Sequence, residues 1–411
     1  VFPCGLEGAR MRRWWREADP WLRAALAAWV AVLVGVCVRN AALPRFSHPV
    51  ARWQAAGAAW LEGRSLYSGS DLDGYRSSPA AASLASVLVP LPLPLAGLLL
   101  RLLAAGSFVA AALWWMRRAL PAGFDDRTRG IALLLMLPLS LGSLDSALVN
   151  LLVLALMLGC LAAAAEERWR VAGLLAALAS MLLLSPLALA GLLLAAFPRR
   201  FALPFLVSLA ALAAVPLLFQ PLGHVAGEYV RWMELLALRG MGHPESCRDL
   251  WHLFKTWHVR LGPGRYELLQ LAGGLGCAAV CAWHTLRGDG ARHRLGLCLW
   301  LAVLWILLLG PATDSASYAF IGPPLAWLLL RTGPDRHPVT HHVAYNAYVV
   351  LLLCSLAGLH PLAMRLLLSA GMQSLAVLYL LLGLGFLAFT WPEGQPQALA
   401  RLDEEPAKRA A

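Results

Sequence analysis

The sequence predicts an all-α polytopic membrane protein, and three observations lead to this fold class. Hydrophobic residues make up 60% of the 411 residues and charged residues only 14%, whereas soluble domains average roughly 45–50% and 25%. The mean hydropathy is +0.65. The apolar residues also gather in long runs that arginines separate. A soluble core cannot bury so much apolar surface at this chain length, so the composition excludes a soluble enzyme.

Ten apolar runs approach the roughly 20 residues that a membrane-spanning helix needs. They are 21–38, 93–116, 129–143, 147–165, 201–219, 267–286, 295–310, 316–330, 343–359 and 374–391. Two further stretches are ambiguous, because prolines end 79–92 and Ser185-Pro186 divides 171–197. Each is a span, a pair of half-helices or a re-entrant element. The total is about 10 to 13 membrane segments.

The basic residues predict the orientation, because arginines and lysines flank the cytoplasmic ends of spans. Arg12, Arg13 and Arg16 place the N-terminus inside, and the later arginine clusters agree if 79–92 does not cross and 171–197 returns to its own side. The chain then divides into a cytoplasmic tail (1–20), a membrane module (21–330), C-terminal membrane helices (331–391) and a second cytoplasmic tail (392–411). Two long loops, 39–78 and 220–265, face outward. We expect a multi-pass protein of the plasma (inner) membrane.

The net charge of +11 fits this arrangement. On a soluble chain it would favour nucleic-acid binding, but here the arginines punctuate apolar segments. We therefore expect membrane lipids as partners and no nucleic acid.

The first outer loop combines an interfacial segment with a polar cluster. The stretch Val50–Leu61 is amphipathic and suited to lie at the membrane interface. Asp71 and Asp73 follow, as candidate catalytic carboxylates or as a solvated turn. His48 has the pKa range of a base. Tyr75 and Arg76 are candidate substrate-binding residues, Arg76 for a phosphate or for interfacial anchoring.

Further candidates lie in the other polar connections. Asp145 and Asn150 separate two apolar runs, where a carboxylate has either a function or an exposed turn. Asp314 follows Gly310-Pro311 near Tyr318, and Arg248 precedes Asp249 in the second loop. His243, Glu245 and Cys247 lack a fourth ligand at a sensible spacing, so no metal site is predicted. No cofactor is identified, and no motif requires a divalent metal.

Several short motifs, in order along residues 20–330, resemble glycosyltransferase family 87. They are Leu61–Tyr67 (LEGRSLY), Tyr75–Pro79 (YRSSP), Leu141–Asp145 (LGSLD) with Asn150, the Pro186 segment ending in Phe197–Phe201 (FPRRF), Tyr229–Trp232 (YVRW), Arg248–Leu250 (RDL) and Gly310–Tyr318 (GPATDSASY). These are polytopic enzymes of the GT-C type that use polyprenyl-phosphate sugars.

The resemblance implies a GT-C-type bundle and chemistry on the outer face. The implied donor is a polyprenyl-phosphate sugar, by resemblance one that carries mannose, and the resemblance does not name the glycan or lipid acceptor. A carboxylate in the first outer loop would act as general base, and attack on the sugar would invert the anomeric carbon. On this hypothesis Asp71, Asp73, Asp145 and Asp314 are candidate catalytic residues. The candidate substrate-binding residues are His48, Tyr75, Arg76, Asn150, Arg248 and Tyr318.

The sequence departs from the family pattern at three places. Phe46-Ser47-His48-Pro49 stands where the family has an acidic residue, Ala147-Leu148 replaces a Gly-Gln pair, and Leu182–Pro186 lacks a basic residue. A second hypothesis is therefore an inactive relative that binds a lipid phosphate or scaffolds envelope enzymes. The third is a transporter or flippase of lipid-linked sugars, for which we find no internal repeat.

Overall fold

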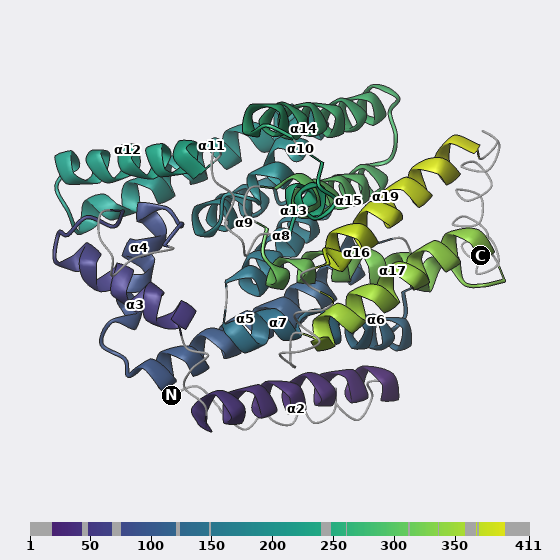
Figure 1. Cartoon of the computed structure of the whole chain (residues 1–411), viewed down its shortest axis with the longest axis horizontal. Coiled ribbons are helices and arrows are strands. Elements are labelled where there is room, and N and C mark those ends of the chain that lie inside the picture. The colour runs from purple at the N-terminus through teal and green to yellow at the C-terminus, as the bar shows by residue number, and fades with distance from the viewer. Residues whose placement is uncertain are drawn as a thin grey trace.

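The computed structural model describes residues 19–42, 48–67, 75–120, 124–147, 149–239, 248–259, 261–310, 313–335, 337–357, 367 and 370–390. Within these ranges the chain forms helices and no strand, which confirms the predicted all-α class (Figure 1). The α-helices are α2 Pro20–Ala42, α3 His48–Leu61, α4 Pro79–Ala85, α5 Leu93–Arg118, α6 Asp126–Leu139, α7 Leu141–Ser146, α8 Asn150–Ala165, α9 Trp169–Leu182, α10 Leu187–Ala196, α11 Pro198–Ala214, α12 Leu222–Arg239, α13 Leu250–Thr256, α14 Pro263–Leu286, α15 Ala291–Leu309, α16 Gly322–Thr332, α17 Pro338–Ala357 and α19 Met372–Thr390. Short 3₁₀ helices are η3 Ser86–Leu88, η4 Val215–Leu218 and η5 Ser315–Ile321.

Six helices of the described ranges are long and apolar enough to cross a membrane: α2, α5, α11 with η4, α14, α15 and α17. Five shorter apolar helical segments accompany them, within α4–η3, α8, α9, α10 and α19. Their apolar side chains pack on one another along most of the bundle and form one large core. The chain is thus a polytopic membrane protein, and the predicted number of crossings remains a prediction.

The bundle has two chemically distinct ends, which lie at opposite ends of α8 and α15. At the basic end, Arg118 and Arg168 pair with Glu166 at 2.8 and 3.2 Å, and Arg200 pairs with Glu167 at 2.7 Å. The polar end lies where α8 and η5 begin and contains Asn40, Asp145, Asn150, Arg248, Asp314 and Tyr318, which are described below. The ion pairs named here thus lie at the ends of helices, where a bilayer tolerates charge.

The ambiguous stretch 171–197 forms a broken helical hairpin whose two ends lie together at the basic end. The helix α9 stops at Leu182 and α10 starts at Leu187, so the break falls at Ser185-Pro186 as the sequence predicted. The rings of Trp169 and Phe197, at the two ends of the hairpin, are 5.2 Å apart. The chain therefore returns to the side from which it entered.

The stretch 79–92 is too short to cross a bilayer. The helix α4 has seven residues and η3 three, about 15 Å of helix against a hydrocarbon core of about 30 Å. Buried small residues fill α4, and its N-cap Ser78 donates from Oγ to the carbonyl oxygen of Met181 at 2.7 Å. The tip of the broken hairpin thus rests on the start of α4.

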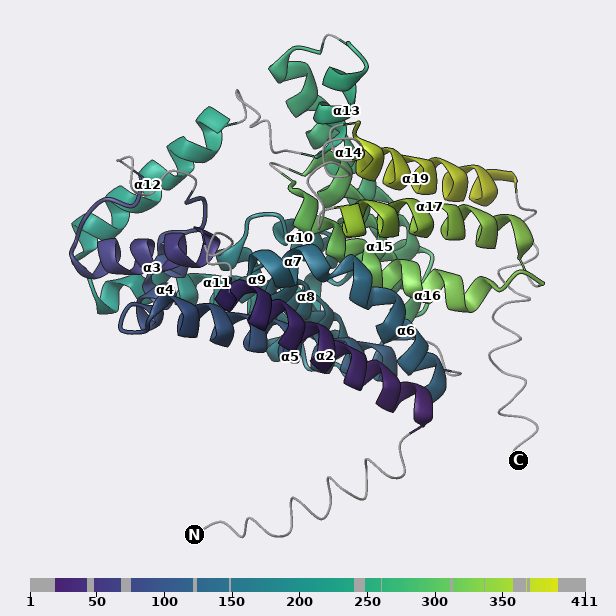
Figure 2. The ribbon, with the colours of Figure 1, turned by 60° about the horizontal axis from the view of Figure 1, so that its bottom comes forward.

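The two predicted outer loops contain helices and are bound to each other. The amphipathic stretch Val50–Leu61 forms most of α3, and the second loop contains α12 and α13. Glu228 of α12 is fully buried and accepts from the amide of Leu66 at 2.9 Å. Trp232 donates from Nε1 to the carbonyl oxygen of Arg76 at 3.0 Å. In Figures 1 and 2, α3, α4 and α12 accordingly lie together at one side of the bundle.

The packing of α9 on α11 gives a testable consequence. A Cβ on Gly173 would lie 2.6 Å from the Pro204 carbonyl carbon, whereas one on Gly191 of α10 would meet nothing within 4 Å. Backbone cannot retreat cheaply, so we expect Gly173→Ala to cost about 1–3 kcal/mol and to lower the melting temperature of the detergent-solubilised chain.

Gly191→Ala is the matched control within the same hairpin. Because alanine favours helix over glycine by about 1 kcal/mol, this control should leave the melting temperature unchanged or raise it. Equal effects of the two substitutions would contradict the described packing of α9 on α11.

Candidate functional site at the polar end

Asp145, at the end of α7, is the centre of a charged cluster. Its Oδ1 pairs with the guanidinium of Arg39 and accepts from Asn40 Nδ2 at 3.2 Å. Arg101 of α5, which is 5% exposed, donates from Nε to the carbonyl oxygen of Leu144 at 3.0 Å and from an amino group to that of Asp145 at 2.8 Å. The carboxylate and the helix end are therefore both compensated by cations from α2 and α5.

Asp314 and Asn150 form a second cluster, in which the two side chains are hydrogen-bonded to each other. Asp314 caps η5 by accepting from the amide and hydroxyl of Ser317 at 2.8 and 2.7 Å. Asn150, at the start of α8, donates from Nδ2 to Asp314 Oδ1 at 3.1 Å and to Ser317 Oγ at 3.2 Å. The loop before α8 and the loop before η5 are thus joined by polar contacts at this end.

Arg248 and Tyr318 form a third cluster beside the second. The amide of Arg248 donates to the carbonyl oxygen of Thr313 at 2.7 Å, one residue before Asp314. The hydroxyls of Tyr318 and Ser374 both donate to the carbonyl oxygen of Arg248, the latter at 2.8 Å. These bonds join the end of the second long loop (220–265) to η5 and α19.

Short contacts connect the three clusters. Ser143 Oγ of α7 donates to the carbonyl oxygen of Ala316 in η5 at 2.9 Å. The helices that carry the Asp145 and Asp314 clusters are therefore in direct contact. Five predicted site residues, far apart in the sequence, thus meet at one end of the bundle: Asp145, Asn150, Arg248, Asp314 and Tyr318.

The remaining predicted residues do not join this group in the described part of the chain. Tyr75 is buried with Tyr67 and Trp53, and its hydroxyl donates to the carbonyl oxygen of Ser78 at 3.2 Å. Arg76 is half-buried, and its guanidinium contacts no hydrogen-bond or ionic partner among the described residues. Both lie beside α12.

The first-loop candidates for the base are described only in part. Asp71 and Asp73 fall outside the described residues, as do His243, Glu245 and Cys247. His48 begins α3, where Val50 packs against Ala96 of α5 and Ala147. The start of α3 therefore lies next to the Asp145 cluster.

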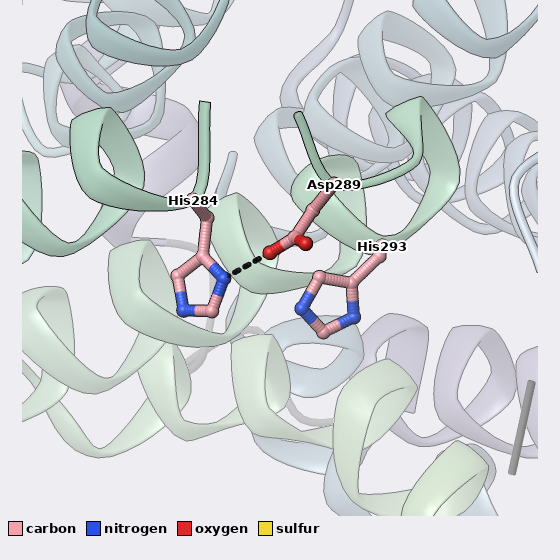
Figure 3. A group of neighbouring side chains, drawn as sticks. All are labelled: His284, Asp289 and His293. Atoms are coloured by element: carbon pink, nitrogen blue, oxygen red, sulfur yellow. Dashed lines mark hydrogen bonds and ion pairs between the residues drawn. The ribbon is translucent and has the colours of Figure 1, made fainter. Parts of the chain in front are cut away.

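Two features of the polar end and one of the basic end escaped the sequence analysis. Arg39 and Asn40 were assigned to the first outer loop (39–78) without a role, and Arg101 stands within an apolar run, where a lone cation itself indicates a buried partner. At the basic end, His284, Asp289 and His293 place their ligand atoms within 4.8 Å of one another (Figure 3). A cavity of about 410 Å³ opens nearby, lined by Arg118, Ala165, Glu166, Arg168 and Arg292.

No protein-family model matches the chain, and no curated protein matches it.

Asp249 gives the polar end a pH dependence. Its side chain is fully buried and caps α13 by accepting from the amide of His252 at 3.1 Å. Burial disfavours the charged form and raises the pKa of this carboxyl to about 6. The folded chain thus holds the Asp249 proton more tightly than the unfolded chain, whose pKa is about 3.9. This stabilisation is full below pH about 4 and is lost as the pH rises through about 6.

Asp249→Asn should remove this dependence, because asparagine caps a helix equally well without titrating. We expect the melting temperature of the variant to change less than that of the parent chain between pH 4 and 7. Asp126→Asn, at a partly buried ion pair with Arg129 away from the polar end, serves as the control. A parent profile that rises over this interval, or one that Asp249→Asn leaves unchanged, would contradict the assignment.

Proposed function

We propose that the chain is an integral membrane glycosyltransferase that moves a sugar from a polyprenyl-phosphate carrier to an acceptor at the polar end, with inversion. By resemblance to family 87 the sugar is mannose. The observation that carries this proposal is the meeting of Asp145, Asn150, Arg248, Asp314 and Tyr318. These residues belong to separate family-like motifs, and a shared reaction site is a reason for separate motifs to converge.

The chemistry requires a base within reach of the acceptor hydroxyl and cations near the leaving phosphate. Arg39 and Arg101 supply positive charge at this end, although both are engaged with Asp145 and its carbonyl. On this proposal the base comes from the first outer loop, from Asp71, Asp73 or His48. The start of α3 beside the Asp145 cluster supports this choice.

A second candidate function is an inactive relative that holds a lipid phosphate. The hydrogen bonds of the two described carboxylates favour it: Asp145 is neutralised by Arg39, and Asp314 caps η5. Both side chains are thus engaged in structural contacts. Arginine and asparagine donors at the same end would still suit a phosphate.

The two candidates are separated by assaying the purified full chain in lipid with labelled polyprenyl-phosphate mannose. We expect transfer or donor hydrolysis, and we expect Asn150→Ala and Asp314→Asn each to lower the rate at least about tenfold. Asp126→Asn, at the partly buried Arg129 pair away from the polar end, is the control and should retain the parent rate. Melting temperatures of all variants report whether a loss of rate is a loss of fold.

If the chain retains polyprenyl phosphate stoichiometrically without turnover, the hypothesis of an inactive relative would replace the enzyme hypothesis. Neither turnover nor retention, with any polyprenyl-phosphate sugar, would overturn both candidates.

We further propose that the basic end faces the cytoplasm, with both termini there, in the plasma (inner) membrane. The arginines of the basic end support this orientation, because basic residues stay on the cytoplasmic side. Glu62 and Glu167 make a matched pair of reporters: each is exposed, and each pairs with an arginine at 2.5 and 2.7 Å.

A membrane-impermeant maleimide applied to intact cells should label Glu62→Cys and spare Glu167→Cys until the membrane is opened. The parent chain, with its native cysteines, gives the background. The reverse labelling pattern would invert the orientation, and labelling of both before opening would exclude the described arrangement of two separated ends.

A further inference from the structure

The turn between α14 and α15 brings three potential metal ligands together. His284 lies in the last turn of α14, Asp289 in the connection and His293 in the first turn of α15. His284 Nδ1 is 2.5 Å from Asp289 Oδ2, and the two imidazole rings are 5.3 Å apart. In Figure 3 the carboxylate lies between the two rings, with a nitrogen of each on its side.

The backbone of this turn fixes the spacing of the ligands. Gly288 has a φ of +78°, the left-handed conformation that glycine adopts without strain. Its amide donates to the carbonyl oxygen of Thr285 at 3.1 Å, and the amide of Asp289 donates to that of His284 at 3.2 Å. This pair of bonds is the Schellman arrangement that ends a helix. Asp289 is thereby held against the last turn of α14, and Gly290 then starts α15.

We propose that His284, Asp289 and His293 bind one divalent metal ion of the zinc class, which ties α14 to α15. Donor atoms of a tetrahedral zinc site lie about 3.4 Å apart at bond lengths of about 2.0–2.2 Å. The ligand atoms here lie within 4.8 Å of one another, and on this proposal side-chain rotations close the remaining gap. Three protein ligands leave one position for water.

The donor set selects the class of ion. Two imidazoles and one carboxylate suit Zn²⁺, Co²⁺ and Ni²⁺, whereas Mg²⁺ and Ca²⁺ prefer oxygen ligands alone. Arg287 stacks on Trp283, its guanidinium carbon 4.7 Å from the ring centroid. The guanidinium of Arg294 is used by the carbonyl oxygen of Ala196, at 3.0 Å. Positive charge near the three ligands lowers the affinity for a metal cation. The guanidinium groups of both arginines, however, interact with other partners.

A metal link has a physical role at this turn. Of the six long apolar helices in the described ranges, α14 has the smallest buried share, 6%. It therefore depends on few side-chain contacts within the chain. A metal held by both helices at the turn would stabilise the α14–α15 hairpin without additional packing, because an ion that binds only the folded chain stabilises that chain.

Cobalt reports such a site directly. We would titrate the full chain, purified in detergent without a histidine tag and stripped of metal, with Co²⁺ and record the d–d absorption. One equivalent should bind with a tetrahedral spectrum, and Zn²⁺ should displace it. His284→Ala, Asp289→Asn and His293→Gln should each lower the Co²⁺ affinity at least about tenfold. His342→Ala, another histidine outside the cluster, is the control and should bind as the parent does.

Thermal unfolding gives the second readout and separates loss of the site from loss of the fold. Zn²⁺ should raise the melting temperature of the parent and of His342→Ala but not of His293→Gln, whose metal-free melting temperature should equal that of the parent. No stoichiometric binding, or binding that all three ligand variants retain, would overturn the proposal. A thiolate-to-cobalt charge-transfer band would also overturn it, because the ion would then lie on cysteines such as Cys281 and Cys298, whose sulfur atoms are 3.8 Å apart.

Discussion

Backbone carbonyls that lie within an apolar bundle must find donors inside the protein, because the hydrocarbon region of a bilayer offers none. Three interruptions of helices in the described part of the chain meet this constraint with specific side chains. The Met181 carbonyl beside the Pro186 break receives the Ser78 hydroxyl, and the Leu144 and Asp145 carbonyls receive Arg101. At the basic end the Ala196 carbonyl receives both Thr285 and Arg294. Polar side chains thus satisfy the backbone at these three places where helices stop.

This constraint also explains why the polar end has the composition of a reaction site. Helix starts need acceptors, which Asp249 and Asp314 supply, and helix ends need donors, which Arg101 supplies. The same carboxylates, amides and guanidinium groups are those that bind sugars and phosphates. Structural capping and the proposed substrate binding would thus draw on one set of residues, and an assay must separate turnover from folding at each of them.

The sequence predicted what depends on local pattern and missed what depends on distant contacts. The apolar runs, the break at Pro186 and the amphipathic α3 follow from hydropathy, proline chemistry and periodicity. The pairing of Arg39 with Asp145 joins residues more than 100 positions apart and has no local pattern. The same holds for the buried Glu228, which accepts a hydrogen bond from the Leu66 amide. The residues around Glu228 in the sequence do not indicate this contact. The His284–Asp289–His293 group escaped for another reason: its spacing becomes a ligand set only when Gly288 closes the turn.

The contacts of the described carboxylates bear on which residue would take a proton in the proposed transfer. Asp145 faces Arg39, and one oxygen of Asp314 accepts three hydrogen bonds. One oxygen of each carboxylate is therefore occupied by structural partners. On the proposed function a base that works beside them lies outside these contacts, and α3, within the predicted first outer loop (39–78), starts next to the Asp145 cluster.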